Sequence, residues 1–321
     1  MSGIVLALAA LCAGVMGYAV QRGATCMVAA LEEVVEKRRA RRVLAMLEAS
    51  AIVAGGLAIA SVAGLLTMRP SEYVLTSWTV IGGVLLGLGA FMARSCVFGA
   101  IARLGSGEWA YLAVPPGFFL GCLAGGRLLG AMAPIPRPSL GGPLQIAPLL
   151  VLPFAGFLLW RAWTVAQAAR AGRLAAHVWS PHVATSVIGL AFVVLLFAAG
   201  PWSYTEALAE AAVGEAMMTG RRLLLFACLF GGAVLGGWTA GRLKLVPPTP
   251  ARVLRCLAGG ALMGAGSVLI PGSNDGLILV GLPLLQPHAW TALASMAVTI
   301  LAALVIRRKA AMAMASARES A

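Results

Sequence analysis

The sequence predicts an all-α polytopic membrane protein, with about nine transmembrane helices and four short re-entrant half-helices arranged in two inverted repeats. Three observations predict this fold: the composition, the recurrence of long apolar runs, and a repeated interruption of those runs. Apolar residues (AVILMFWYC) make up 60% of the 321 residues, charged residues make up 11%, and the mean hydropathy is +0.92. Since soluble domains carry about 25% charged residues, this composition excludes a water-soluble globular protein.

Nine apolar runs are long enough to cross a hydrocarbon core about 30 Å thick. They cover residues 3–20, 43–66, 74–92, 109–130, 144–160, 182–200, 222–240, 253–269 and 287–306. No basic residues precede the first run, so we expect it to be a retained membrane helix rather than a signal peptide.

The net charge of +13 does not indicate nucleic-acid binding, because the Lys and Arg residues stand in short clusters between the apolar runs. Such clusters mark the cytoplasmic side of a membrane protein. If the basic run 37–42 is cytoplasmic, alternation of the crossings puts the clusters at 161–173, 242–255 and 307–309 on the same side. The N-terminus is then expected outside and the C-terminus in the cytoplasm.

Four shorter segments begin at breaks marked by Gly, Pro or polar residues, namely 21–36, 94–107, 201–218 and 271–286. We interpret them as half-helices that enter the membrane without crossing it. Non-helical backbone is tolerated at that depth only where protein or a water-filled cavity satisfies its polar groups.

A glycine motif occurs twice, as GGVLLGLG at 82–89 and GGALMGAG at 259–266. The offset between these copies also aligns the break at Cys26 with Ser203 and the break at Cys96 with Ser273. Five crossings separate the copies, so the two halves would be inverted. The predicted division is 1–143 for the first repeat, 144–181 for a linker helix and cytoplasmic loop, and 182–321 for the second repeat.

Corresponding interruptions in inverted halves point to a transport site near the membrane midplane. The alternative interpretation is that the glycines serve ordinary helix packing, which also uses small residues at this spacing.

Cys26 and Cys96 are the leading candidates for a site, because each stands at the start of a predicted half-helix with an arginine a few residues before it. The N-terminus of a helix attracts anions, and a thiol is a soft, weak hydrogen-bond donor. This pairing suits a small anion with a terminal sulfur. A purely structural role remains the alternative, and it is expected for the cysteines within continuous apolar runs: Cys12, Cys122, Cys228 and Cys256.

Eight further residues at the breaks complete the candidate site: Gln21, Arg22, Arg94, Ser95, Ser203, Ser273, Asn274 and Asp275. Arg22 and Arg94 either contribute to an anion site or set the topology. Asn274 is expected to be a helix cap. Asp275, the only Asp in the chain, is either a cap or a functional ionisable group. Since a carboxylate repels an anion, a functional Asp275 would orient donors, pair with an arginine or take a proton.

No Walker loop, GxSxG or HExxH pattern is present, so neither an ATPase nor a familiar hydrolase is indicated. His177, His182 and His288 are not spaced as metal ligands. We therefore expect no enzyme activity, no metal and no cofactor.

Three segments carry a resemblance to a known family: 17–26 with its Q-R-G-A-T-C ending, 87–109, and PGSNDGLILVGLP at 271–283. They resemble the YeeE/YedE sulfur-transport family of bacterial inner-membrane proteins. The resemblance implies an hourglass-shaped pathway narrowed by half-helices, through which cysteine thiols pass thiosulfate or a related sulfur anion. Cys26 and Cys96 match family cysteines. A third family cysteine lies in the second half, where the internal alignment puts Ser273 opposite Cys96, and no cysteine is matched to it.

The leading hypothesis is thus a permease for a small sulfur-containing anion in the bacterial inner membrane, surrounded by lipid, with a cytoplasmic sulfurtransferase or regulator as a further partner and no nucleic acid. One alternative is a membrane sensor that signals to a sulfur-oxidation regulator through the segment 37–42. Another is a covalent sulfur carrier that uses a cysteine persulfide. Uptake into liposomes separates the first two, and intact-mass analysis after incubation with thiosulfate tests the third.

Overall fold

The computed structural model describes residues 3–64, 71–137, 147–175, 177–214 and 219–319, and this part of the chain is almost entirely helical. Each of the nine predicted runs contains a long helix. These are α1 (Gly3–Gly23), α3 (Arg41–Val62), α4 (Ser77–Ala93), α6 (Val114–Leu129), α8 (Ala147–Arg170), α9 (Pro181–Ala199), α11 (Gly220–Thr239), α12 (Pro250–Leu269) and α14 (Pro287–Glu319). Among the described residues, eight helical segments are long and apolar enough to cross a membrane, and α8 is not one of them. The chain is therefore a multi-pass, all-α membrane protein.

Short helices occupy all four segments predicted to hold half-helices. They are α2 (Met27–Lys37), α5 (Val97–Gly105), α10 (Tyr204–Val213) and α13 (Asn274–Gly276), the last continuing as the π-helical turn η4 (Leu277–Gly281). The smaller elements are the 3₁₀ turns η1 (Trp109–Ala113), η2 (Gly130–Met132) and η3 (Arg173–Ala175), and the strands β1 (Glu72–Tyr73) and β2 (Pro136–Arg137), which pair antiparallel.

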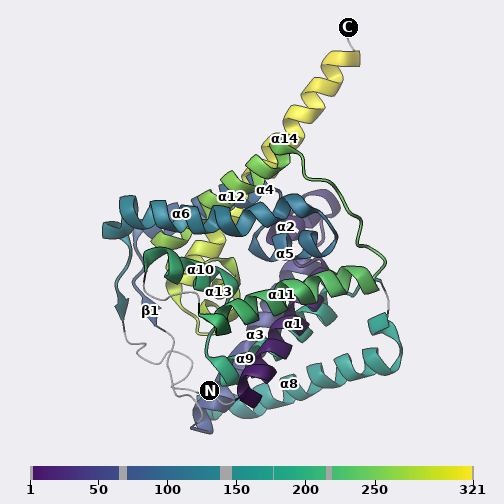
Figure 1. The fold of residues 1–321 in the computed structure, drawn as a ribbon, viewed down its shortest axis with the longest axis vertical. Coiled ribbons are helices and arrows are strands. Elements are labelled where there is room, and N and C mark those ends of the chain that lie inside the picture. The colour runs from purple at the N-terminus through teal and green to yellow at the C-terminus, as the bar shows by residue number, and fades with distance from the viewer. Residues whose placement is uncertain (1–2, 65–70, 138–146, 176, 215–218, 320–321) are drawn as a thin grey trace.

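The helices form two groups with the short helices between them. Figure 1 shows α4, α6, α12 and α14 together in its upper part, and α1, α3, α9 and α11 below them, with α2, α5, α10 and α13 in the middle. The order of long and short helices before α8 recurs after α8. Contacts recur in the same way: α1 packs on α11 as α9 packs on α3, and α6 packs on α12 as α14 packs on α4.

The repeated glycine motif lies where α4 and α12 cross. A methyl group added at Gly89 would lie 2.5 Å from the carbonyl oxygen of Gly259, and one added at Gly259 would lie 2.7 Å from that of Gly89. The corresponding distances are 2.8 Å from Gly82 to the oxygen of Gly266 and 2.6 Å in the reverse direction. Since neither backbone can retreat without separating the helices, these glycines serve close helix packing. The motif itself is thus a packing surface, while the breaks that follow it begin the short helices.

The two ends of the bundle differ in charge. At one end, Arg307 pairs with Glu32 at 3.0 Å, and Arg308 donates to the carbonyl oxygen of Val35 at 3.2 Å. These contacts bring the C-terminal basic cluster beside α2, which leads into the basic run 37–42. At the same end, the amide of Lys244 donates to the carbonyl oxygen of Ser106 at 3.0 Å. Most of the basic clusters therefore gather at one end, which we name the basic end.

At the opposite end, β1 and the segment before α14 meet, and the Gln286 side chain donates to the carbonyl oxygen of Ser71 at 2.9 Å. Arg222 on α11 pairs with Glu210 on α10 at 2.5 Å. We name this the opposite end. The two ends provide the two mouths described below.

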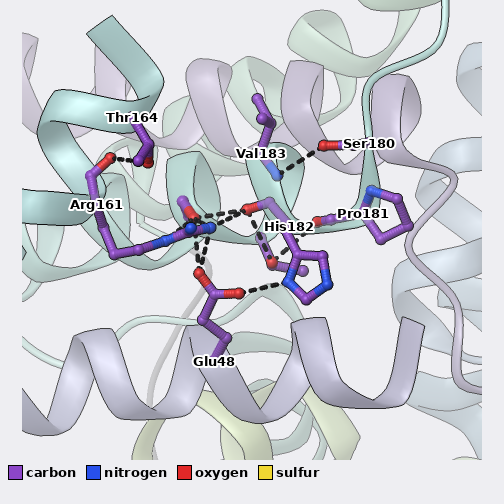
Figure 2. Close-up of polar contacts among 9 residues, drawn as sticks. Glu48, Arg161, Thr164, Ser180, Pro181, His182 and Val183 are labelled. Carbon is purple, nitrogen blue, oxygen red and sulfur yellow. Dashed lines mark hydrogen bonds and ion pairs between the residues drawn. The ribbon is translucent and has the colours of Figure 1, made fainter. Parts of the chain in front are cut away.

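A buried network fastens α8 to the rest of the bundle (Figure 2). Arg161 of α8 forms an ion pair with Glu48 of α3 and donates to Ser186 of α9 at 2.6 Å. The second oxygen of Glu48 lies 2.5 Å from Nδ1 of His182, at the start of α9. The side chains of Arg161 and Glu48 are 9% and 15% exposed. No specific role was expected for His182, because nothing near it in the chain indicates that Glu48 would face it.

Replacing Arg161 with Leu should destabilise the protein by about 3–5 kcal/mol, because Glu48 would keep a buried charge without its main partner. The double variant Glu48→Gln/Arg161→Leu should recover most of this loss, and Arg170→Leu, at the exposed end of the same helix, should have little effect. Unfolding of the purified protein in detergent measures all three. An Arg161→Leu variant as stable as the wild type would show that the network contributes little.

Candidate functional site

The two candidate cysteines meet in the middle of the bundle. Cys26 is the N-cap residue of α2 and Cys96 is the N-cap residue of α5. The Cys96 thiol donates to the Cys26 sulfur across 3.7 Å, and the backbone N–H of Met27 donates to the Cys96 sulfur at 3.2 Å. Cys26 is 7% exposed and Cys96 is fully buried. The starts of two short helices thus face each other through a pair of thiols.

The same turn delivers each cysteine to this point. After α1, the amide of Ala24 donates to the carbonyl oxygen of Gln21, and the amide of Thr25 donates to that of Val20. After α4, the amide of Arg94 donates in the same way to the carbonyl oxygen of Phe91, and the amide of Ser95 donates to that of Ala90. Both turns contain a non-glycine residue in the left-handed region, with φ of 47° at Ala24 and 55° at Arg94. Such a residue costs about 1–2 kcal/mol, so the surrounding packing must hold these turns in place.

Gly99, in the first turn of α5, lets the thiols approach. A methyl group at this position would lie 2.5 Å from the Cys26 sulfur and 2.4 Å from the Ser95 hydroxyl oxygen. Both atoms are buried side-chain atoms, so a larger residue would have to displace the Cys26 thiol. The contact between the two cysteines therefore depends on having glycine at position 99, three residues after Cys96.

A cavity of about 230 Å³ opens from this pair toward the basic end, and we name it the inner cavity. Its lining includes Gln21, Cys26, Arg42, Arg94, Gly99, Arg103, Ser106 and Arg242. Arg103 pairs with Glu108 at 3.0 Å and Arg42 with Glu33 at 3.6 Å. Among the described residues, the side chains of Arg94 and Arg242 have no hydrogen-bond or ion-pair partner. The inner cavity therefore presents uncompensated positive charge in front of a thiol.

A larger cavity of about 470 Å³ opens at the opposite end, and we name it the outer cavity. Its lining includes Ser203, Glu206, Arg221, Arg222, Ser273, Gly276 and His288. Cys96 lines neither cavity. It lies between them, because α13 at the outer cavity contacts α5 and α10, and the Tyr204 hydroxyl of α10 donates to the oxygen of Val97 at 3.0 Å.

Of the four candidates of the second half, Ser203 and Ser273 line the outer cavity, and Asn274 and Asp275 are buried next to Ser273 in α13. Ser203 caps α10 by accepting from the amide of Glu206 at 3.2 Å. Ser273 is the N-cap residue of α13, but its hydroxyl makes no capping bond. The side-chain atoms of Asn274 are fully buried without a hydrogen-bond partner in the described part of the chain. The expectation that Asn274 caps the helix is therefore wrong, because Ser273 holds that position.

Asp275 is 2% exposed and accepts a hydrogen bond from the Thr205 hydroxyl at 2.5 Å. Its partner is thus a neutral hydroxyl, where the sequence also allowed an arginine.

Two of the candidates beside the cysteines are bonded elsewhere. The guanidinium of Arg22 donates to the Tyr18 hydroxyl at 2.8 Å and to the Thr239 hydroxyl at 2.9 Å, and Arg22 does not line the inner cavity. It ties α1 to α11. The Ser95 hydroxyl donates to the oxygen of Cys96 at 3.1 Å. Arg94, by contrast, does line the inner cavity. Gln21 lines it as well and donates to the Ser106 hydroxyl at 3.4 Å.

The sequence did not indicate that Thr205 would donate to Asp275, or that Arg42, Arg103 and Arg242 would line the inner cavity. The three arginines belong to clusters that topology alone accounts for, and only the meeting of distant loops places them around one cavity. Its position two residues after Ser203, at the predicted break, was the one indication in the sequence that Thr205 could belong to the site.

Comparisons with known proteins show which family the chain belongs to. The family model for sulphur transport matches residues 22–302. The chain belongs to this sulphur transport family. It is also 31% identical over 97 residues to the thiosulfate transporter TsuA of Escherichia coli (strain K12), an alignment that covers 30% of this chain and 27% of that relative. The resemblance noted in the sequence is therefore confirmed at the level of the family.

Gly99→Ala should separate the thiols, because the added methyl group meets the Cys26 sulfur. In a background that retains only Cys26 and Cys96, a mild oxidant should join the two cysteines, and Gly99→Ala should slow this reaction several-fold. Gly156→Ala, where an added methyl group meets nothing within 4 Å, is the control. Intact mass and peptide mapping measure the cross-link, and equal rates in the two variants would contradict the geometry.

Proposed function

We propose that the protein transports thiosulfate, or a related small anion with a terminal sulfur, along a pathway that narrows between Cys26 and Cys96. The observation that carries this proposal is the meeting of two thiols, 3.7 Å apart, at the starts of two short helices below a basic cavity. The family membership and the thiosulfate transporter among the relatives support the same substrate class.

Each part of the constriction suits such an anion. The uncompensated Arg94 and Arg242 raise the local concentration of anions at the inner cavity. The first turns of α2 and α5 offer backbone N–H groups and the positive ends of two helices. A thiol donates weakly and is polarizable, so Cys26 and Cys96 complement a terminal sulfur better than an oxyanion of oxygen alone. Sulfate would meet the same charges without this complementarity.

The pathway has the outline of an hourglass, with the inner and outer cavities separated by the buried Cys96. We further propose that helices α1 to α6 and α9 to α14 are inverted repeats joined by α8. The recurrence of helix order and contacts supports this division. So does the crossing of α4 and α12, where each glycine contact reappears when the two helices are exchanged.

With the basic end in the cytoplasm of a bacterial inner membrane, the N-terminus lies outside and the C-terminus inside. We expect a reporter that is active only in the cytoplasm to work at the C-terminus and to fail at the N-terminus. The physical reason is the gathering of Lys and Arg at one end of the bundle. Termini on the same side would contradict both this orientation and the inverted repeat.

Cys26→Ala and Cys96→Ala should each reduce thiosulfate uptake into proteoliposomes at least tenfold, because each removes one of two thiols that meet the anion. Cys228→Ala, on α11 and partly exposed, should transport like the wild type. Wild-type protein should prefer thiosulfate to sulfate, and the Cys→Ser variants should lose that preference, since serine keeps the donor and removes the soft sulfur.

The same experiment judges the alternatives. Full uptake by the Cys26→Ala/Cys96→Ala double variant at normal membrane abundance would remove the site assignment. Binding without uptake would favour a membrane sensor. Sulfur added to the intact mass after incubation with thiosulfate would favour covalent transfer.

A further inference from the structure

A buried carboxylate lies beside the proposed pathway without a cationic partner in the described part of the chain. Asp275 is 2% exposed, in the short helix that begins at the outer cavity and contacts α5, the helix of Cys96. The ion pairs formed at the opposite end involve other residues, such as Arg222 with Glu210. Taking an ionised carboxylate out of water without a counter-charge is costly, and such a group prefers to be neutral.

A chain of hydroxyl groups connects this carboxylate to the outer cavity. Ser203 lines the cavity, and its hydroxyl oxygen lies 3.3 Å from that of Thr205, which donates to Asp275 at 2.5 Å. The amide of Glu206 donates to the Ser203 oxygen, which fixes that end. When Asp275 is ionised, the Thr205 hydrogen points to Asp275 and the Ser203 hydrogen to Thr205. Because a hydroxyl both donates and accepts, the chain can carry a proton inward.

The groups around Asp275 favour its protonated form when an anion binds at the cysteine pair. On α10 it faces Tyr204 and Thr205, with the carboxylates of Glu206 and Glu210 further along the same helix. At the start of α5, the thiol of the N-cap residue Cys96 acts on Tyr204 together with Asp275. None of these groups supplies positive charge, and the arginine that acts on Glu206, Arg222, is paired with Glu210. An anion at the cysteine pair would therefore raise the free energy of an ionised Asp275.

We propose that the transport is coupled to protons and that Asp275 is the proton-binding group. This rests on the function proposed above and adds its co-substrate. A hydronium ion in the outer cavity gives a proton to Ser203, Ser203 gives its own to Thr205, and Thr205 gives its own to Asp275. One O–H bond forms for each that breaks. The anion then passes a neutral carboxyl group, and Asp275 releases the proton toward the inner side before the next cycle.

Proteoliposomes loaded with a pH-sensitive dye test this directly with thiosulfate as the probe. Wild-type protein should acidify the lumen during thiosulfate uptake, and an imposed pH gradient, alkaline inside, should increase the initial rate several-fold. Asp275→Asn keeps an acceptor for Thr205 but cannot bind the proton. It should lose both effects while it retains exchange of labelled for unlabelled thiosulfate, which needs no net proton movement.

Variants of the hydroxyl chain provide the matched controls. Thr205→Val should reduce the stimulation by the pH gradient and retain exchange, and Thr205→Ser should restore the stimulation. Thr164→Val, on α8, where the hydroxyl donates to the oxygen of Arg161 and to no other group in the described residues, should behave like the wild type.

Three results would overturn the proposal in distinguishable ways. Thiosulfate uptake by the wild type with no proton movement and no response to the gradient would remove proton coupling and leave the transport function standing. Absence of both uptake and exchange in the wild type would remove the transport function, and coupling with it. Full stimulation in an Asp275→Asn variant that retains exchange would exclude Asp275 as the proton-binding group.

Discussion

Where α1 and α4 end, in the middle of the bundle, α2 and α5 begin with backbone N–H groups that have no partner within their own helices. In a hydrocarbon core such groups must be satisfied by protein or by a lined cavity. The sulfur of Cys96 accepts the first N–H of α2, and the Cys96 thiol itself is paired with Cys26. The start of α5 thus satisfies one amide of α2 through a side chain, and the two thiols connect the broken helices. The rest of the bundle holds them together, with the glycine crossing of α4 on α12 on one side and the packing of α1 on α11 on the other.

Charged side chains are paired with opposite charges in one part of the molecule and separated from them in another. At the linker helix, Arg161 is matched by Glu48, and each keeps further polar partners in Ser186 and His182. This arrangement avoids the free-energy cost of an isolated buried charge and leaves little unpaired charge for a ligand to bind. Along the proposed pathway the charges are separated: Arg94 and Arg242, which have no partner among the described residues, face the inner cavity, and Asp275 is bonded to a hydroxyl. The electrostatic free energy of the second arrangement therefore changes more than that of the first when an anion enters the proposed pathway.

Much of this could be predicted from the sequence because membrane helices are local features. Runs such as 182–200 correspond to helices such as α9 within a few residues, since hydrophobic length alone decides them. The breaks at Cys26 and Cys96 were also visible, because polar residues interrupt otherwise apolar runs. The contacts of Arg22 with Thr239 and of Asp275 with Thr205 were not visible. They join segments far apart in the chain, and neither pattern nor propensity carries information on which side chains face each other across a bundle. The inverted repeat and the orientation of the termini rest on the same local signals and stay predictions.

The proposed equivalence of Cys26 with Ser203 and of Cys96 with Ser273 would have a consequence for direction. At the aligned turns, Cys26 lines the inner cavity with Cys96 buried behind it, whereas Ser203 and Ser273 line the outer cavity. A molecule approaching from one mouth meets hard oxygen donors first and soft sulfur afterwards, and from the other mouth it meets them in reverse. On the proposed pathway, two similar halves would therefore enclose an axis whose two ends differ chemically. An anion with one sulfur end and one oxygen end could then enter with one end first and leave with the other end first.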